Sequence, residues 1–243
     1  MRRERPALGI LGGMGPLATA DFYRRLVERT PAGSDQGHLP VLMWADPAVP
    51  DRTAALLGEG PSPVPALVEG ARWLRRAGAS CVAVPCNTAH AYVEQLAKAA
   101  GVEVLDMIEA ALEAAAGKVP GVQRVGILAT RGTRLAGLYE RAGARLGVEV
   151  IQVPDRVQLE YVDAAIRAVK GGADLAGPER WIAEAAGNLR GQGAQVVVAA
   201  CTEIPLVSGA AAGVLPLVDS TEALVDAVLS RLWRADPFDQ ASS

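Results

Sequence analysis

The feature that most constrains the fold of this chain is an alternation of short apolar runs with longer amphipathic segments. Strands that are apolar along their whole length are buried on both faces, which is typical of a parallel sheet covered by helices on each side. The sequence therefore predicts the α/β fold class. The expected strands are Ala7–Leu11, Val41–Trp44, Cys81–Val84, Val102–Leu105, Arg124–Leu128, Val148–Gln152, Gln195–Ala199 and Val214–Val218. The expected helices are Pro16–Arg29, Val64–Arg76, Ala89–Ala100, Thr133–Leu146, Val157–Val169, Pro178–Leu189 and Thr221–Trp233.

Two short motifs recur in the second half of the chain. Gly9-Ile10-Leu11 matches Gly126-Ile127-Leu128, and Cys86-Asn87-Thr88 resembles Cys201-Thr202-Glu203 after nearly the same interval. Matches at one period favour a duplicated unit of about half the chain. The alternative is that α/β proteins repeat strand, loop and helix without any duplication.

Composition and charge exclude several classes of protein. Half of the residues are apolar, which is ample for a core, and 24 Lys+Arg against 27 Asp+Glu leave no basic surface for nucleic acid. No apolar run approaches the roughly 18–20 residues of a membrane span. Glycines and Pro16 interrupt the apolar N-terminal segment, which argues against a secretory signal. Three cysteines are an odd number, so we expect a reducing, cytoplasmic location without a disulfide framework.

Four loops follow predicted strands, at the edge where open α/β sheets bind ligands. Two of them deliver a cysteine at matching places in the half-chains, Cys86 and Cys201. If a pseudo-twofold axis relates the halves, these thiols face each other across a cleft. Cys81 lies inside a predicted strand, so we expect it to be an inert apolar residue. When a cysteine stands at the start of a helix that follows a strand, the helix dipole and the free N–H groups favour its thiolate and lower its pKa.

Opposed thiols suit one kind of reaction in particular. If a thiolate takes a proton from one face of a carbon and a thiol returns a proton to the other face, that carbon is inverted. The two groups exchange roles with the handedness of the substrate. A matched pair of small acid–base groups is what a duplication supplies.

The motifs of the chain resemble those of the aspartate racemases, within the cofactor-independent aspartate/glutamate racemase superfamily. They lie in order at Gly9–Asp21, Pro50–Thr53, Pro85–His90 and Cys201–Pro205, and the similarity runs from about Ala7 to Trp233. The resemblance implies two similar parallel-sheet α/β domains, an active site in the cleft between them, no cofactor, and a homodimer. We predict a first domain of residues 1–104 plus 216–243 and a second of residues 105–215.

The resemblance also implies roles for individual residues. Cys86 and Cys201 take the places of the two catalytic cysteines. Arg52 matches a residue that holds the distal carboxylate of the substrate, which its planar fork can bind bidentately, and Lys170 is similar to a lysine that assists it. Asn87, Thr88 and Thr202 match residues around the α-carboxylate. The complete predicted substrate-binding set is Met14, Arg52, Asn87, Thr88, Thr130, Lys170, Thr202 and Glu203, with no metal ligand.

The substrate expected from these motifs is a small acidic amino acid. Aspartate is the first expectation, and glutamate or a broader range of amino acids is the alternative. Arg131 stands where aspartate racemases usually carry a small polar residue, and Arg156 is a further arginine that either binds an anion or lies on the surface. Hydantoin racemase and maleate isomerase also use two cysteines and stay open. A decarboxylase with one cysteine is disfavoured, and a protein that only binds an amino acid would not need paired thiols.

Other classes of site fit the sequence less well. The run Gly13–Ala18 matches G-x-G-x-x-A after a strand, as in dinucleotide-binding domains, but the acidic residue about 20 positions on is missing. Cys81, Cys86, His90 and Cys201 do not complete a metal-binding pattern. We expect His38 and His90 to be hydrogen-bonding or packing residues. No lysine motif for pyridoxal phosphate stands near a phosphate-binding loop.

Overall fold

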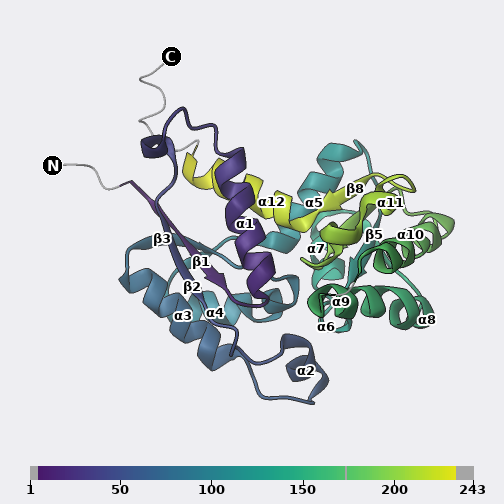
Figure 1. Ribbon diagram of the computed structural model, residues 1–243, viewed down its shortest axis with the longest axis horizontal. Coiled ribbons are helices and arrows are strands. Elements are labelled where there is room, and N and C mark those ends of the chain that lie inside the picture. Colours follow the sequence, from purple (N-terminus) through teal and green to yellow (C-terminus); the bar gives the residue numbers. More distant parts are fainter. Residues whose placement is uncertain (1–4, 173, 234–243) are drawn as a thin grey trace.

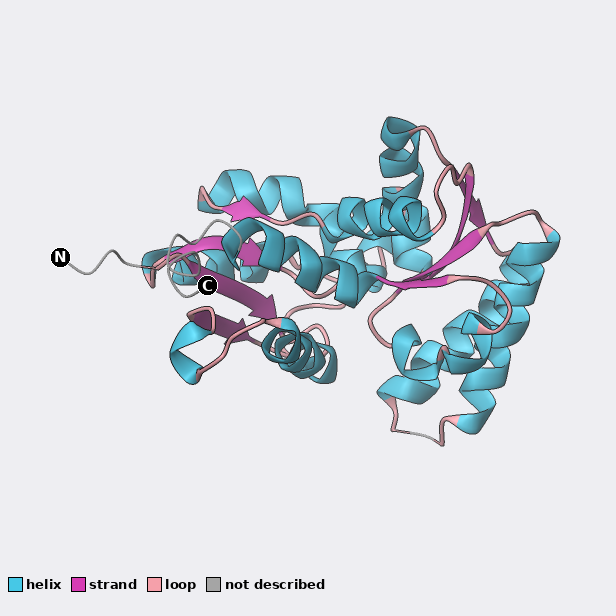
Figure 2. Ribbon diagram, turned by 90° about the horizontal axis from the view of Figure 1, so that it is seen from above, coloured by secondary structure: helices cyan, strands magenta, loops and turns pink. Residues whose placement is uncertain are grey.

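The computed structural model describes residues 5–172 and 174–233, which form two parallel sheets with helices on both faces (Figures 1 and 2). The predicted α/β fold class is confirmed. The two sheets, which lie toward opposite ends of the molecule in Figure 2, have the same strand order, β2-β1-β3-β4 in the first and β6-β5-β7-β8 in the second. The strands are β1 (Ala7–Gly12), β2 (Val41–Ala45), β3 (Ala79–Ala83), β4 (Glu103–Val104), β5 (Arg124–Ala129), β6 (Glu149–Gln152), β7 (Val196–Ala200) and β8 (Leu217–Asp219).

Helices connect the strands and cover the sheets. The α-helices are α1 (Pro16–Arg29), α2 (Arg52–Leu57), α3 (Val64–Arg76), α4 (Val93–Ala100), α5 (Met107–Lys118), α6 (Arg131–Leu135), α7 (Leu138–Leu146), α8 (Asp155–Val157), α9 (Asp163–Lys170), α10 (Ala176–Gly191), α11 (Gly209–Ala212) and α12 (Ser220–Val228). The shorter turns are η1 (Asp35–Gly37), η2 (Asn87–Tyr92), η3 (Gln158–Val162), η4 (Ile204–Val207) and η5 (Leu229–Trp233). The predicted bounds of α1 and α3 are confirmed.

Four predicted helices are not regular α-helices throughout, and one of them, Thr221–Trp233, ends as the π-helical turn η5. The helix expected at Thr133–Leu146 is two helices, because Gly137 adopts a left-handed φ of 58° between α6 and α7. The segment expected at Ala89–Ala100 begins as the 3₁₀ turn η2, and the helix expected at Val157–Val169 includes a π-helical turn, η3. Helices α2, α5 and α11 are not among the expected ones.

The core of each half is divided by its sheet. In β1, Leu8 and Ile10 pack on the face covered by α1 and α12, whereas Leu11 packs on the face covered by α3 and α4. Alternate side chains of a strand point to opposite faces, so a strand that is apolar at every position fills both layers. The second sheet is arranged in the same way, with α5 and α7 on one face and α9 and α10 on the other.

The C-terminal segment does not follow the predicted domain boundary throughout. Strand β8 pairs with β7, so Leu217–Asp219, which the boundary assigns to the first domain, belong to the second sheet. The helix that follows does return to the first half, because Leu224 and Val228 of α12 pack with Phe22 of α1. The remaining division into domains stays a prediction, and residues 1–4 and 234–243 lie outside the described residues.

No helix in the described ranges is long and apolar enough to cross a membrane.

Candidate active site

One small cavity brings together every residue that the sequence predicts for the site. It lies where the loops after β1, β3, β5 and β7 meet, between the two halves, and its volume is about 20 Å³. This is room for about one water molecule. The cavity is lined by Met14, Asp51, Arg52, Thr53, Cys86, Asn87, Thr88, Thr130, Lys170, Cys201, Thr202 and Glu203. The individual roles of these residues stay predictions.

The two candidate cysteines come from corresponding places in the two halves. Cys86 follows β3 and directly precedes η2, and Cys201 follows β7. Both side chains are buried, 6% and 5% exposed. Because β3 and β7 hold the same position in their sheets, the repeated strand order places one thiol from each half on the same cavity.

Cys201 is bonded to an acidic neighbour. Its Sγ–H donates to Glu203 Oε2 at 2.9 Å, and the same oxygen accepts from Thr202 Oγ1 at 3.4 Å. Burial, followed by the nearby Glu203 charge, raises the pKa of the Cys201 thiol well above its ordinary value. Cys201 is therefore a thiol in this arrangement, with a carboxylate placed to accept its proton.

Asn87 connects the two halves through a chain of hydrogen bonds. The Tyr139 hydroxyl donates to Asn87 Oδ1 at 2.7 Å, and Asn87 Nδ2 donates to Ser220 Oγ at 3.0 Å. Ser220 in turn donates to the Ala199 carbonyl at 2.7 Å. All of these groups are buried, so the side chain of Asn87 fixes the loop after β3 against the second half.

Thr88 makes a second connection across the cavity. Its hydroxyl is hydrogen-bonded to Thr130 Oγ1 at 2.9 Å and to Thr133 Oγ1 at 3.0 Å. Thr130 also caps α6 by accepting from the Thr133 backbone N–H. The loops after β3 and β5 are thus held together by hydroxyl groups at the cavity wall.

Arg52 presents a positive charge without a carboxylate partner. Its Nη1 donates to the carbonyls of Val49 and Pro50, and its Nη2 donates to the carbonyl of Met14 at 3.1 Å. No carboxylate of the described residues lies within ion-pair distance, and the buried Nε has no hydrogen-bond partner. A held guanidinium with a free N–H suits an anion.

Lys170, at the end of α9, is the second cation of the cavity. Its Nζ lies 3.9 Å from Glu203 Oε1, and the side chain is half-exposed. Glu203 therefore lies between Cys201 and Lys170.

The glycine-rich loop after β1 is fixed by close contacts. Gly13 has a φ of 92°, and a Cβ there would lie 2.5 Å from the backbone of Asp46. The Gly13 N–H donates to Thr19 Oγ1 at 2.9 Å, and that hydroxyl donates to the Gly15 carbonyl at 3.0 Å. The loop places Met14 at the cavity, and the positive φ and close backbone contact explain why position 13 is a glycine.

Two lining residues, Asp51 and Thr53, were not predicted, although the quoted Pro50–Thr53 motif contains both. Asp51 caps α2 by accepting from the Ala54 N–H at 2.7 Å. Thr53 lies so close to α6 that a Cβ on Gly132 would meet its Oγ1 at 2.7 Å. Helix α2 of the first half therefore covers the cavity against α6 of the second.

The arginines that the sequence left open do not line this cavity. Arg131 forms an ion pair with Asp163, with its Nε 3.1 Å from Oδ2, and borders a separate surface pocket. Arg156 pairs with Glu160 at 3.0 Å and is largely exposed. Arg156 is accordingly a surface residue in this structure.

His90 holds the backbone at Cys86. The Met107 N–H donates to His90 Nε2 at 3.1 Å, so the ring proton sits on Nδ1, which donates to the Cys86 carbonyl at 3.0 Å. Burial lowers the pKa of this histidine and keeps it neutral. The expectation that His90 is a hydrogen-bonding residue is confirmed.

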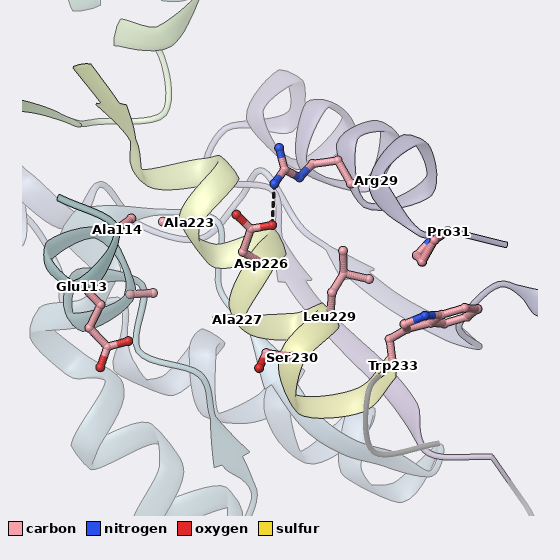
Figure 3. A pocket seen from close by; sticks show the side chains of 11 residues that line it. Arg29, Pro31, Glu113, Ala114, Ala223, Asp226, Ala227, Leu229, Ser230 and Trp233 are labelled. Carbon is pink, nitrogen blue, oxygen red and sulfur yellow. Dashed lines mark hydrogen bonds and ion pairs between the residues drawn. The ribbon is translucent and has the colours of Figure 1, made fainter. Parts of the chain in front are cut away.

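A larger cavity lies elsewhere. It is a groove of about 730 Å³ between α1, α5 and α12, lined mainly by small side chains such as Ala114 and Ala227 (Figure 3). The Arg29–Asp226 ion pair, 2.5 Å, lies at its wall. No cysteine lines the groove. In addition, the described residues contain no cluster of three or more His, Cys, Asp or Glu that could hold a metal ion.

Comparison with known proteins identifies the family. The profile of the Asp/Glu/hydantoin racemases matches residues 11–228, nearly the whole chain. The chain belongs to this family. The broad-specificity amino-acid racemase RacX of Bacillus subtilis (strain 168) is 26% identical over 231 residues, which cover 92% of this chain and 96% of RacX.

Solved racemases have the same fold. The aspartate racemase of Picrophilus torridus matches with a TM-score of 0.77 and 27% identity, over 94% of each chain. A glutamate racemase of Francisella tularensis, solved with D-glutamate, matches with a TM-score of 0.70 and 19% identity over 95% of this chain and 81% of that one. Family membership and these relatives make the protein an amino-acid racemase, an isomerase.

Cys81 gives a first prediction, because it is the cysteine outside the cavity. It is fully buried in the core, and burial raises the pKa of its thiol to about 11. We expect Cys81→Ala to retain racemase activity within about twofold and to lose roughly 1 kcal/mol of stability. Activity assays and urea unfolding check this expectation. A loss of activity without a loss of stability would contradict it.

His90 gives a prediction about pH. Since its pKa in the folded protein is lowered, the unfolded chain binds a proton there that the folded protein does not, once the pH falls below about 6.5. The free energy of unfolding should therefore fall by up to about 1.4 kcal/mol per pH unit as the pH decreases from 6.5. His90→Asn should lower stability at neutral pH and remove this part of the slope.

Urea unfolding at pH 7.5 and pH 5.5 measures that slope. The other histidine of the chain, His38, provides the control, and His38→Asn should keep the pH dependence of the wild type. The same slope in His90→Asn as in the wild type would show that His90 is not the group that takes up the proton.

Proposed function

We propose that the protein is a cofactor-independent racemase of acidic amino acids, with aspartate as the first substrate and glutamate as the second. The observation that carries the proposal is the convergence of Cys86, Cys201 and Arg52 on one cavity. A thiol from each half supplies an acid and a base, and the guanidinium supplies a partner for an anionic side chain. The racemase relatives support the same chemistry.

The proposed reaction moves one proton off the α-carbon and another onto it. A Cys86 thiolate removes the α-proton, and the electron pair of the broken C–H bond moves into the α-carboxylate. Cys201, which carries its proton, donates it to the opposite face of the same carbon. The product has the inverted configuration, Cys86 is a thiol and Cys201 is a thiolate, so the enzyme is set for the reverse reaction.

Glu203 supports Cys201 in both directions. Because Glu203 Oε2 accepts from the Cys201 thiol, it can take the proton when Cys201 has to act as the base toward the other enantiomer. It can likewise return the proton after Cys201 has acted as the acid. In this scheme Glu203 acts as a proton-accepting partner of Cys201, and its predicted role in binding the substrate stays a prediction.

The charges of the cavity favour a dicarboxylic substrate. Arg52 has no carboxylate partner among residues 5–172 and 174–233, and Lys170 lies at the longer distance of 3.9 Å from Glu203. A distal carboxylate would complete the hydrogen bonds of Arg52 and compete with Glu203 for Lys170. Backbone N–H groups after Cys86 and Cys201 remain the proposed partners of the α-carboxylate and its enolate-like transition state.

Chiral chromatography tests the proposed function. The purified protein is incubated without added cofactor with a panel of single L-amino acids and, in parallel, with their D-enantiomers. We expect aspartate or glutamate to approach an equal mixture from both sides. A panel in which no amino acid is racemised would overturn the proposal.

We also propose a homodimer, on the basis of the resemblance of the motifs to aspartate racemases. Sedimentation equilibrium at several protein concentrations tests the association state. A single species of 25.2 kDa at all concentrations would contradict it.

A further inference from the structure

A second pocket adjoins the cavity and shares part of its wall. It measures about 260 Å³, and Arg52, Lys170, Thr202 and Glu203 line both spaces. The pocket also reaches Gly15, where a Cβ would lie 3.9 Å from Glu203 Oε1. The two spaces are therefore neighbours, separated by the Lys170–Glu203 ion pair and by Arg52.

The rest of the pocket wall is apolar. It is formed by the first turn of α1, the end of α9 and η4, through Pro16, Leu17, Ala18, Val169 and Leu206. Ala18 and Val169 are buried, whereas Leu17 and Leu206 are 64% and 38% exposed at the surface. These residues carry no side-chain hydrogen-bonding group, so they offer a surface for methylene groups rather than for a charge.

The cavity between the thiols cannot hold a whole amino acid as it stands. Its volume of about 20 Å³ leaves room for about one water molecule. The adjoining pocket is the larger of the two spaces and borders the residues that we propose as anion partners. Free volume for side-chain atoms beyond Cβ of a bound substrate therefore lies next to the cavity, behind the Lys170–Glu203 ion pair and Arg52.

We propose that this apolar pocket receives the substrate side chain and extends the range of the racemase to amino acids with unbranched apolar side chains. The inference rests on the proposed function, because it assumes that the α-carbon lies between the two thiols. Short acidic side chains end at Arg52 and Lys170, which stand at the boundary of the two spaces. Longer apolar chains pass this boundary and contact Leu17 and Leu206.

A homologous series of substrates tests the pocket. Alanine, 2-aminobutyrate, norvaline and norleucine differ by one methylene at each step. If each added methylene is buried against the apolar wall, kcat/KM should rise about two- to fourfold per step. Racemisation rates are measured by chiral chromatography, and dissociation constants by calorimetry on the same protein.

A double variant locates the effect. Leu17→Ser with Leu206→Ser should lower the norleucine-to-alanine ratio of kcat/KM at least about fivefold while alanine changes less than about twofold. The matched control is Leu135→Ser with Leu146→Ser, two leucines of similar exposure, 60% and 41%, that do not line this pocket. The control should keep the ratio of the wild type.

The outcomes separate this inference from the proposed function. Racemisation of alanine and aspartate, without any rise along the series or with a rise that the double variant leaves unchanged, would overturn the pocket and leave the proposed function standing. Tighter binding along the series without turnover of any of its members would overturn the extended substrate range, and racemisation of aspartate by the same protein would still leave the proposed function standing. Neither turnover nor binding of any amino acid would overturn both.

Discussion

Replacing Cys86 or Cys201 with alanine is expected to lower racemisation by about 10³-fold or more. Each substitution removes the acid or base on one face of the α-carbon, and positioned general acid–base catalysis contributes about 10²–10⁴-fold per group. Inversion needs both faces, so either loss alone should suffice. Chiral chromatography from pure L- and pure D-substrate measures the rate in both directions.

Hydrogen exchange should survive where inversion does not. With Cys201→Ala, Cys86 can still remove the α-proton of one enantiomer and return a deuteron to the same face in D₂O. With Cys86→Ala, the opposite enantiomer should exchange, and more slowly, because the Cys201 thiol must first give its proton to Glu203. Proton NMR of the recovered substrate measures both rates.

The buried third thiol provides the matched control for this experiment. Cys81→Ala removes the same atoms but lies in the core beneath α1 and α12, away from the cavity. It should racemise both enantiomers at nearly the wild-type rate. Racemisation that survives in both Cys86→Ala and Cys201→Ala would refute the scheme with two bases.

The strand pattern and the loop positions could be predicted because each rests on local sequence. β1 and β7 are apolar at nearly every position, which predicts strands that are covered on both faces. Cys201 directly follows β7, and Cys86 lies three residues after the end of β3, so their place at the carboxyl edge also follows from the chain alone. The Pro50–Thr53 motif and the cysteine motifs together resemble those of the aspartate racemases, and this resemblance predicted that Arg52 belongs to the same site.

Other features depend on contacts that local sequence does not contain. Helix α5 packs against α12 and α7 and has alanine at five of its twelve positions, so its polar face is reduced to a narrow stripe with Glu109 and Glu113, and the pattern of an amphipathic helix is weak. The bond from Cys201 to Glu203 depends on the turn after β7, and the ion pair with Lys170 depends on where α9 ends. The apolar pocket likewise needs α1, α9 and η4 side by side, which only the tertiary structure provides.

Replacing Arg52 with alanine should separate acidic substrates from neutral ones. A charged hydrogen-bonded contact contributes about 1.5–3 kcal/mol, so kcat/KM for aspartate should fall about 10- to 100-fold, whereas kcat/KM for alanine should change less than about threefold. Since Arg52 also donates to the carbonyls of Met14 and Pro50, the ratio between the substrates is the decisive quantity. A general loosening of the loop would affect both substrates alike.

A second arginine supplies the control for that ratio. Arg131 lies at the start of α6, and its guanidinium pairs with Asp163 outside the cavity, so Arg131→Ala removes an arginine without removing the proposed anion partner. Its ratio of aspartate to alanine activity should stay at the wild-type value. Equal losses for aspartate and alanine in Arg52→Ala would remove the proposed role of Arg52. The side chain of alanine ends at a methyl group and has no distal carboxylate for the guanidinium to hold, so a specific role should affect aspartate alone.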